Sequence, residues 1–300
     1  MTRNKTIEVS EDDRLRYLPR CLTCETDFRG ADSGLILGDC LEVMPLLPEK
    51  SVDLLIADPP YNLSKKFDGM SFSASVESEY AEYTRRWLAA AAPLLKNTAS
   101  VYVCCDWRSS GAVGAVLGEF FTVRNRITWQ REKGRGAAKN WKNNLEDVWF
   151  ATVSDDYVFN LPAVKIRRAV RAPYRENGEP KDWFTLGSKA YRDTCPGNFW
   201  DDLTVPFWSM KENTTHPTQK PEKLVAKLIL ASSDPGGVVF DPFAGSGTTA
   251  VTAKKLGRRF FAVERSENYC ILAQKRLELA ETDKTIQGYS DGVFWERNSK

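Results

Sequence analysis

Residues 52–61 of the chain read Val52-Asp53-Leu54-Leu55-Ile56-Ala57-Asp58-Pro59-Pro60-Tyr61. The first six residues form an apolar run of strand length, which predicts that the next four lie in a loop at the carboxyl edge of a sheet. Open α/β sheets bind their ligands at that edge. Such a loop offers a carboxylate, free backbone carbonyls and an aromatic ring, and it suits a flat ring that carries an amine. The alternative is that Pro59 and Pro60 merely end a strand.

A glycine-rich stretch follows a second apolar run near the other end of the chain. The run Gly237-Val238-Val239-Phe240 leads into Asp241-Pro242-Phe243-Ala244-Gly245-Ser246-Gly247-Thr248-Thr249, and residues 250–256 are helix-forming. Glycines let a backbone approach a ligand closely, and the amino terminus of a helix favours negative groups. This second loop is therefore a candidate cofactor site.

With both stretches present, the sequence resembles the amino-group DNA methyltransferases, which use S-adenosylmethionine to methylate N6 of adenine or N4 of cytosine. The motif order, with Asp58-Pro59-Pro60-Tyr61 early and the glycine-rich loop late, is similar to the permuted beta class of that family. The resemblance covers most of residues 35–280. It implies a Rossmann-like α/β methyltransferase fold that is circularly permuted and carries an inserted target-recognition region. It also implies S-adenosylmethionine as cofactor and double-stranded DNA as partner.

The resemblance further implies which residues hold the cofactor. Asp39 and Cys40 would lie near its adenine, although Asp39 could simply cap a helix. In the hexapeptide 216–221, polar groups would meet the methionine carboxylate, with helix capping as the alternative. Glu264 ends an apolar strand about twenty residues after the glycine-rich turn, a placement that suits a ribose diol. The expected set is Asp39, Cys40, His216, Thr218, Gln219, Lys220, Asp241, Phe243, Ala244, Gly245, Ser246, Gly247, Thr248 and Glu264.

The tetrapeptide carries the chemistry that the resemblance implies. The Asp58 carboxylate and the Pro59 carbonyl would accept the two hydrogens of the target amine, and Tyr61 would stack on a base flipped out of the duplex. Asp at the first motif position favours adenine, because the cytosine enzymes more usually have Ser there. Cytosine N4 is the main alternative, and an RNA methyltransferase or a non-catalytic DNA-binding regulator is more distant. A nicotinamide-dependent oxidoreductase fits poorly, because the third glycine of its fingerprint is absent.

Two middle stretches are expected to contact DNA. Residues 130–144 carry five basic residues and one acidic residue, with tryptophan near both ends. This composition suits phosphate contact and base stacking, and a solvated loop is the alternative. Residues 161–215 are irregular, aromatic and locally basic, as expected of a region that reads base edges. In the polar loop that follows the tetrapeptide, Lys65 and Lys66 are also expected to meet phosphates. The full set expected to contact DNA is Lys65, Lys66, Arg131, Lys133, Arg135, Lys139 and Lys142.

Composition limits the remaining possibilities. The 300 residues are 42% hydrophobic and 27% charged with a net charge of +2, which is typical of a globular chain. No apolar stretch approaches the ~20 residues of a membrane span, and no signal-peptide core is visible, so we expect a cytoplasmic protein. The seven cysteines favour reduced thiols, and the Cys21/Cys24 spacing lacks the second pair that a zinc site needs, so no metal is expected.

The chain divides into five expected segments. They are an arm (1–30), a catalytic half (31–129), a DNA-contacting loop with the target-recognition region (130–215), a cofactor-binding half (216–285) and a tail (286–300). A monomer or homodimer and a cognate restriction endonuclease are compatible with the class that the chain resembles.

Overall fold

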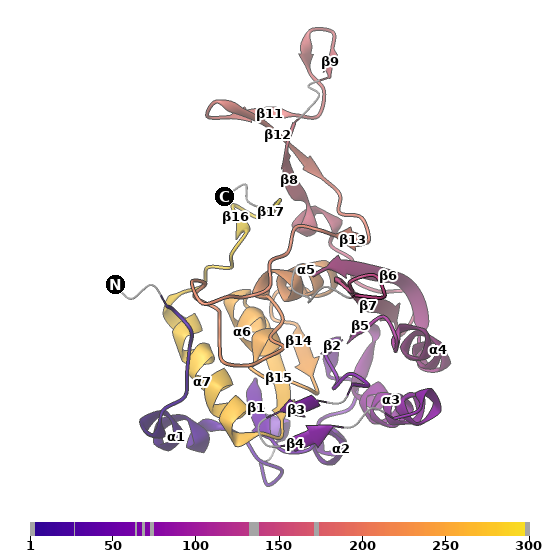
Figure 1. The fold of residues 1–300 in the computed structure, drawn as a ribbon, viewed down its shortest axis with the longest axis vertical. Coiled ribbons are helices and arrows are strands. Elements are labelled where there is room, and N and C mark those ends of the chain that lie inside the picture. Colours follow the sequence, from indigo (N-terminus) through magenta and orange to yellow (C-terminus); the bar gives the residue numbers. More distant parts are fainter. Residues whose placement is uncertain are drawn as a thin grey trace.

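The computed structural model describes residues 4–26, 28–63, 65–67, 70–72, 75–131, 138–170 and 174–297. Its centre is an eight-stranded sheet with the strand order β1-β15-β14-β2-β5-β7-β6-β13 (Figure 1). Neighbouring strands are parallel, except that β7 runs antiparallel to both β5 and β6. The strands are β1 (Gly34–Leu37), β15 (Arg259–Glu264), β14 (Val238–Asp241), β2 (Val52–Ala57), β5 (Leu95–Cys105), β7 (Leu145–Thr152), β6 (Thr122–Gln130) and β13 (Phe199–Trp200).

Helices cover both faces of this sheet, which explains why β2 is apolar along most of its length. Successive β2 residues point to opposite faces: Leu55 joins one hydrophobic cluster, and Leu54 and Ile56 join the other. The first cluster lies under α2 (Cys40–Val43), α3 (Glu77–Ala91) and α4 (Ser110–Phe120). The second lies under α5 (Glu222–Ser232), α6 (Thr248–Lys255) and α7 (Glu267–Thr282).

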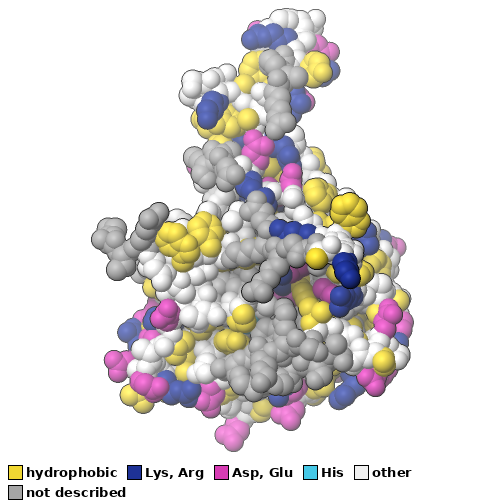
Figure 2. Space-filling model, viewed as in Figure 1, with side chains coloured by type: hydrophobic (Ala, Val, Ile, Leu, Met, Phe, Trp, Pro, Cys, Tyr) yellow, Lys and Arg dark blue, Asp and Glu magenta, His cyan; other side chains and the backbone are white. Residues whose placement is uncertain are grey.

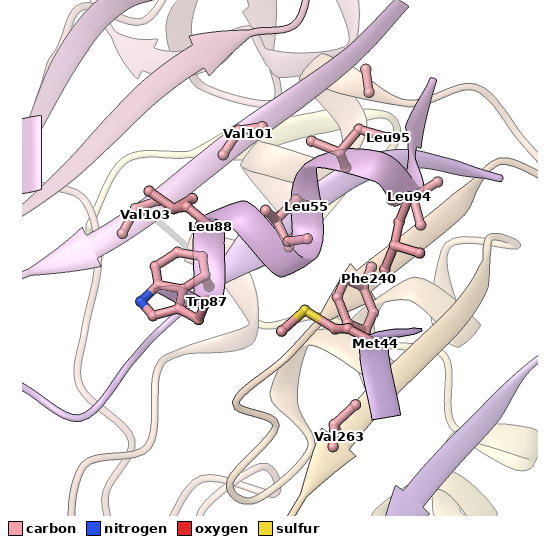
Figure 3. Packing of buried hydrophobic residues seen from close by; sticks show 14 of the residues in the cluster. Met44, Leu55, Trp87, Leu88, Leu94, Leu95, Val101, Val103, Phe240 and Val263 are labelled. Carbon is pink, nitrogen blue, oxygen red and sulfur yellow. The ribbon is translucent and has the colours of Figure 1, made fainter. Parts of the chain in front are cut away.

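Helix α3 shows how the sequence builds the first cluster. Its buried residues recur every three or four positions, so they lie on one face of the helix. Trp87 and Leu88 are fully buried and pack near Leu55 and Phe240 of the sheet (Figure 3). The aromatic side chains of Tyr80 and Trp87 on this face therefore belong to the core.

A second, five-stranded sheet projects from the main domain (Figure 1). Its strands are β11 (Phe184–Leu186), β12 (Lys189–Thr194), β8 (Ile166–Ala169), β17 (Val293–Trp295) and β16 (Tyr289–Ser290), in that order. Residues 286–300, which we expected to form a C-terminal tail, include β17, and this strand pairs in parallel with β8 and places Phe294 opposite Ile166. A three-residue strand is too short to show periodicity, and its partner is far away in the sequence.

The amino-terminal segment packs on the main domain. Helix α1 (Glu11–Tyr17) lies against α7, where Asp13 pairs with Lys275 at 2.8 Å and Arg14 donates to Asn268 at 3.0 Å. Leu22 bridges to Ile36 at the edge of the main sheet. All seven cysteines are free thiols. Among the described residues, no helix combines the length and the apolar character needed to cross a membrane.

The remaining elements of the described residues are short. They are two hairpins, β3 (Lys65–Phe67) with β4 (Met70–Phe72) and β9 (Arg175–Glu176) with β10 (Glu179–Pro180), and five 3-10 turns, η1 (Leu18–Arg20), η2 (Phe28–Gly30), η3 (Met44–Leu46), η4 (Ala92–Leu94) and η5 (Leu161–Val164).

Candidate active site

The two motif loops meet in one pocket. Strands β14 and β2 are adjacent and parallel, so the loops that follow them leave the same edge of the sheet side by side. The cavity there has a volume of about 250 Å³. Its lining includes every residue expected to act in catalysis or cofactor binding except Gly247. The structure thus brings together segments that lie far apart in the sequence.

Gly247 has a different part in the loop. Its φ is 76°, it is the N-cap of α6, and a Cβ at this position would lie 2.5 Å from the Cβ of Ala273 on α7. Gly245 also has a positive φ, 52°, and a Cβ there would lie 3.0 Å from Nε2 of His216. Glycine at 247 therefore lets the loop pack against α7, whereas glycine at 245 leaves room at the pocket wall.

Two acidic side chains stand behind the glycine-rich loop. The Glu264 carboxylate accepts from the backbone N–H groups of Gly245 and Ser266, both at 2.8 Å, and burial raises its pKa. Asp241 accepts from the backbone N–H of Phe243 at 2.9 Å, and burial raises its pKa to about 7. Carboxylate oxygens keep further lone pairs after such bonds. These hydrogen-bond acceptors fit a cofactor with ribose hydroxyls and a cationic end.

The hexapeptide 216–221 forms another wall. Burial, followed by the charges of Lys220 and Arg276, lowers the pKa of His216 to about 4, so the imidazole is neutral at neutral pH. The Gln219 amide accepts from Thr214 at 2.6 Å and donates to the Glu212 carbonyl at 2.7 Å. The Gln219 amide thus holds the hexapeptide in place. Its hydrogen-bonding groups are therefore not wholly available to the methionine carboxylate of the cofactor.

Asp39 also has a local partner, since its side chain accepts from the backbone N–H of Leu41 at 2.9 Å and caps α2. Asp39 therefore both caps α2, as the alternative interpretation predicted, and lines the pocket.

Lys220 lies on the catalytic tetrapeptide. Its ammonium donates to both carboxylate oxygens of Asp58, at 2.8 and 2.7 Å, and lies 3.5 Å from Oε2 of Glu146. Tyr61 donates to the same Glu146 oxygen at 3.4 Å. Arg131 pairs with the other oxygen, Oε1. The expected contact of Lys220 with the cofactor carboxylate stays a prediction, and in this structure the ammonium is hydrogen-bonded to Asp58.

Glu146 lies in this pocket although its sequence position did not predict a role there. It is the second residue of β7 and is followed by Asp147, so two acids lie near the start of a mostly apolar strand. The available sequence signal was a pair of adjacent acids beside an apolar run, a context in which charged residues are rarely buried without a partner. Tyr83, Cys104, Arg265 and Tyr269 also line the pocket and were not predicted.

The residues expected to contact DNA are placed unevenly. Arg131 lines the pocket, and Lys139 and Lys142 are exposed on the stretch that follows. Lys65 and Lys66 lie on β3, and their side chains are outside the described part. Lys133 and Arg135 lie outside the described residues. Among the residues that the structure describes, no group of three or more His, Cys, Asp or Glu side chains could hold a metal ion, and Cys21 and Cys24 form no such group.

The sheet order, the glycine-rich loop and the Asp-Pro-Pro-Tyr pocket together define a Rossmann-like methyltransferase. A family model described as DNA methylase, for N6 and N4 amino-group enzymes, matches residues 52–275, and the chain belongs to this family. The confirmed predictions are therefore the family, the permuted α/β fold, the enzyme class and S-adenosylmethionine as cofactor.

Individual relatives agree with this assignment. The chain is 33% identical to the DNA adenine methyltransferase YhdJ of Escherichia coli (strain K12) over 265 residues, which is 86% of this chain and 87% of that protein. It is 29% identical to the type II methyltransferase M.HpaI of Haemophilus parainfluenzae over 256 residues, 82% of this chain and 74% of that protein. Among solved structures, the M1.HpyAVI–SAM complex matches with a TM-score of 0.55 and 25% identity, covering 81% and 98% of the two chains. The cytosine-N4-specific PvuII DNA methyltransferase shares the fold with a TM-score of 0.62 and 17% identity, covering 86% and 89%.

Proposed function

We propose that the protein transfers a methyl group from S-adenosylmethionine to N6 of a flipped-out adenine in double-stranded DNA. The observation that carries this proposal is Asp58, a carboxylate in the pocket wall directly beside the glycine-rich loop. An adenine enzyme among the relatives, YhdJ, supports the choice of base.

The target amine needs help because its lone pair is delocalised into the ring. The Asp58 carboxylate and the Pro59 carbonyl can accept its two hydrogens and draw the nitrogen toward tetrahedral geometry. Tyr61, which lines the same pocket, provides an aromatic face for a base that has left the stack. When bound, S-adenosylmethionine supplies an electrophilic methyl group on its sulfonium. The chain's own residues thus orient the amine, and no covalent enzyme intermediate is needed.

Cofactor binding is assigned to the other side of the pocket. We place the adenosine near Glu264 and residues 38–41, and the methionine end near the glycine-rich loop and the hexapeptide 216–221. The buried carboxyl of Asp241 lies beneath that loop, where it can face a cationic ligand.

DNA contacts are assigned to the segment that begins at the pocket. We propose that Arg131, Lys139 and Lys142 meet phosphates, together with Lys65, Lys66, Lys133 and Arg135. Lys and Arg side chains also lie along the projecting sheet and at its base (Figure 2). We also propose that the protein has a cognate restriction endonuclease, which would cut the unmethylated form of the same DNA site.

Identification of the methylated nucleoside tests the proposal. The purified protein is incubated with labelled S-adenosylmethionine and either duplex DNA or RNA, and the products are digested to nucleosides. We expect label in N6-methyldeoxyadenosine. Label in N4-methylcytosine would establish the cytosine alternative, and label in RNA alone would refute the substrate class.

A further inference from the structure

A buried cluster of charges closes the catalytic end of the pocket. The side chains of Lys220 and Glu146 are 10% and 6% exposed, whereas that of Asp58 is 26% exposed. One ammonium thus lies between two carboxylates, with both Asp58 oxygens in hydrogen-bond contact and Glu146 slightly farther away. Burial alone would lower the pKa of Lys220, but the carboxylates of Asp58 and Glu146 raise it above its ordinary value. Lys220 is therefore an ammonium in its position between the two carboxylates.

This arrangement conflicts with the role assigned to Asp58. An incoming amine must compete for the carboxylate with a charged donor, and hydrogen bonds that involve two ionised groups are stronger than those that involve a neutral donor. An ammonium on Asp58 also withdraws negative charge from the oxygens that must accept the amine hydrogens. The bonds seen in the structure thus mask the acceptor.

Glu146 offers the ammonium a second position. Its Oε2 atom is 3.5 Å from Nζ of Lys220, so an approach of about 0.7 Å reaches ordinary hydrogen-bond length. The Oε1 atom is held by Arg131, and the Tyr61 hydroxyl lies 3.4 Å from Oε2. Glu146 is therefore anchored, and Oε2 faces the ammonium.

We propose that Glu146 is a positioning residue that takes up the Lys220 ammonium when the target amine reaches Asp58. In the free enzyme Lys220 masks Asp58, and in the complex it moves to Glu146 and exposes both Asp58 oxygens to the base. No proton is transferred in this step, because the same ammonium changes partner. The inference rests on the proposed role of Asp58 in adenine methylation.

Replacing Glu146→Gln tests the inference, because a neutral amide is a weaker partner for the ammonium. With saturating S-adenosylmethionine and duplex DNA, we expect single-turnover methylation to slow by roughly 10- to 100-fold, with little change in KM for DNA or in cofactor affinity. Glu146→Asp keeps the charge and should be faster than Glu146→Gln. In the double variant Glu146→Gln/Lys220→Met no ammonium masks Asp58, and the rate should exceed that of Glu146→Gln alone.

Asp147→Asn is the matched control. It makes the same charge change at the neighbouring residue of β7, but Asp147 accepts from Ser110 at 2.7 Å and Thr128 at 2.8 Å and does not line the catalytic pocket. Its rate per folded molecule should match the wild type. A purely structural role for Glu146 predicts instead that the double variant is slower than either single variant.

The outcomes separate the inference from the proposed function. If the wild-type enzyme methylates adenine and Glu146→Gln is equally fast, or the double variant shows no recovery, the masking inference is wrong while the function stands. If the wild type methylates no adenine in DNA, both are wrong.

Discussion

The Asp58 carboxylate has two opposing requirements, one for its stability as a partly buried charge and one for catalysis. A half-buried carboxylate needs a counter-charge, and Lys220 provides one through two hydrogen bonds of 2.8 and 2.7 Å. A good hydrogen-bond acceptor needs that counter-charge to leave. Glu146 and Arg131 resolve the conflict by supplying one more charge of each sign at the same site.

Replacing Asp58→Ala should remove an acceptor that is needed chiefly at the transition state. By comparison with other single polar contacts of this kind, we expect turnover to fall by roughly 10²-fold or more. S-adenosylmethionine should still bind, because its adenosine is assigned to Glu264 and residues 38–41 and not to Asp58. Calorimetry for the cofactor and single-turnover methylation would measure the two effects. A near-normal rate in Asp58→Ala would remove Asp58 from the mechanism.

Tyr61→Ala should act on capture of the base. Loss of a stacking platform costs about 1–3 kcal/mol, and a mismatched target base, which is easier to extrude, should restore part of the activity. The comparison of matched and mismatched duplexes measures this difference. Equal defects on both duplexes would argue against stacking.

Among elements, the loop between β14 and α6 illustrates how packing and ligand binding share one sequence. Gly245 keeps the pocket side open, and Gly247 lets the same loop lie against α7. The two glycines are thus two residues apart, but each is required by a different neighbour, His216 for Gly245 and Ala273 for Gly247.

Replacing Gly247→Ala should destabilise the protein through both backbone and packing. A left-handed residue costs about 1–2 kcal/mol with a side chain, and overpacking against Ala273 adds about 1–3 kcal/mol. Gly236→Ala is the matched control, since its φ is 78° and nothing lies within 4 Å of its added Cβ. Denaturant unfolding of both variants would measure the difference. Equal losses would show that α7 yields to the new methyl group.

The sequence predicted the ends of β2 and β14, because each strand has a strong local signal. Apolar runs followed by Asp58 or Asp241 identified two strand ends, and the structure shows that both ends lie at the same edge of the sheet. Lys220 and Glu146 could not be paired in this way, because the 3.5 Å between them depends on the register of β7 in the sheet. The pairing of β17 with β8 could not be predicted from the sequence either, because a run of three apolar residues does not indicate which strand it will pair with.

At the scale of the whole molecule, the projecting sheet joins three distant parts of the chain. Phe294 of β17 is fully buried with Val164, Ile166 and residues of α5. The proposed target-recognition region is therefore anchored to the cofactor-binding half by a hydrophobic cluster of its own.

Replacing Phe294→Ala should loosen this anchor, at a cost of about 3–5 kcal/mol for a large buried aromatic. We expect faster hydrogen exchange in β8 and β12, while β14 and β15 stay protected. Phe199→Ala is the control, because Phe199 is 54% exposed. Uniformly faster exchange across both sheets would mean that the projection and the main domain unfold as one unit.

The pairing of β17 with β8 also sets an order of events during synthesis. Strand β8 leaves the ribosome long before residues 293–295, and at about 5–20 residues per second its edge waits on the order of ten seconds for this partner. An unpaired strand edge can recruit strands from other chains. The projecting sheet is thus completed late in translation, and a premature stop codon shortly before residue 293 would leave β8 with an open edge on an otherwise folded enzyme.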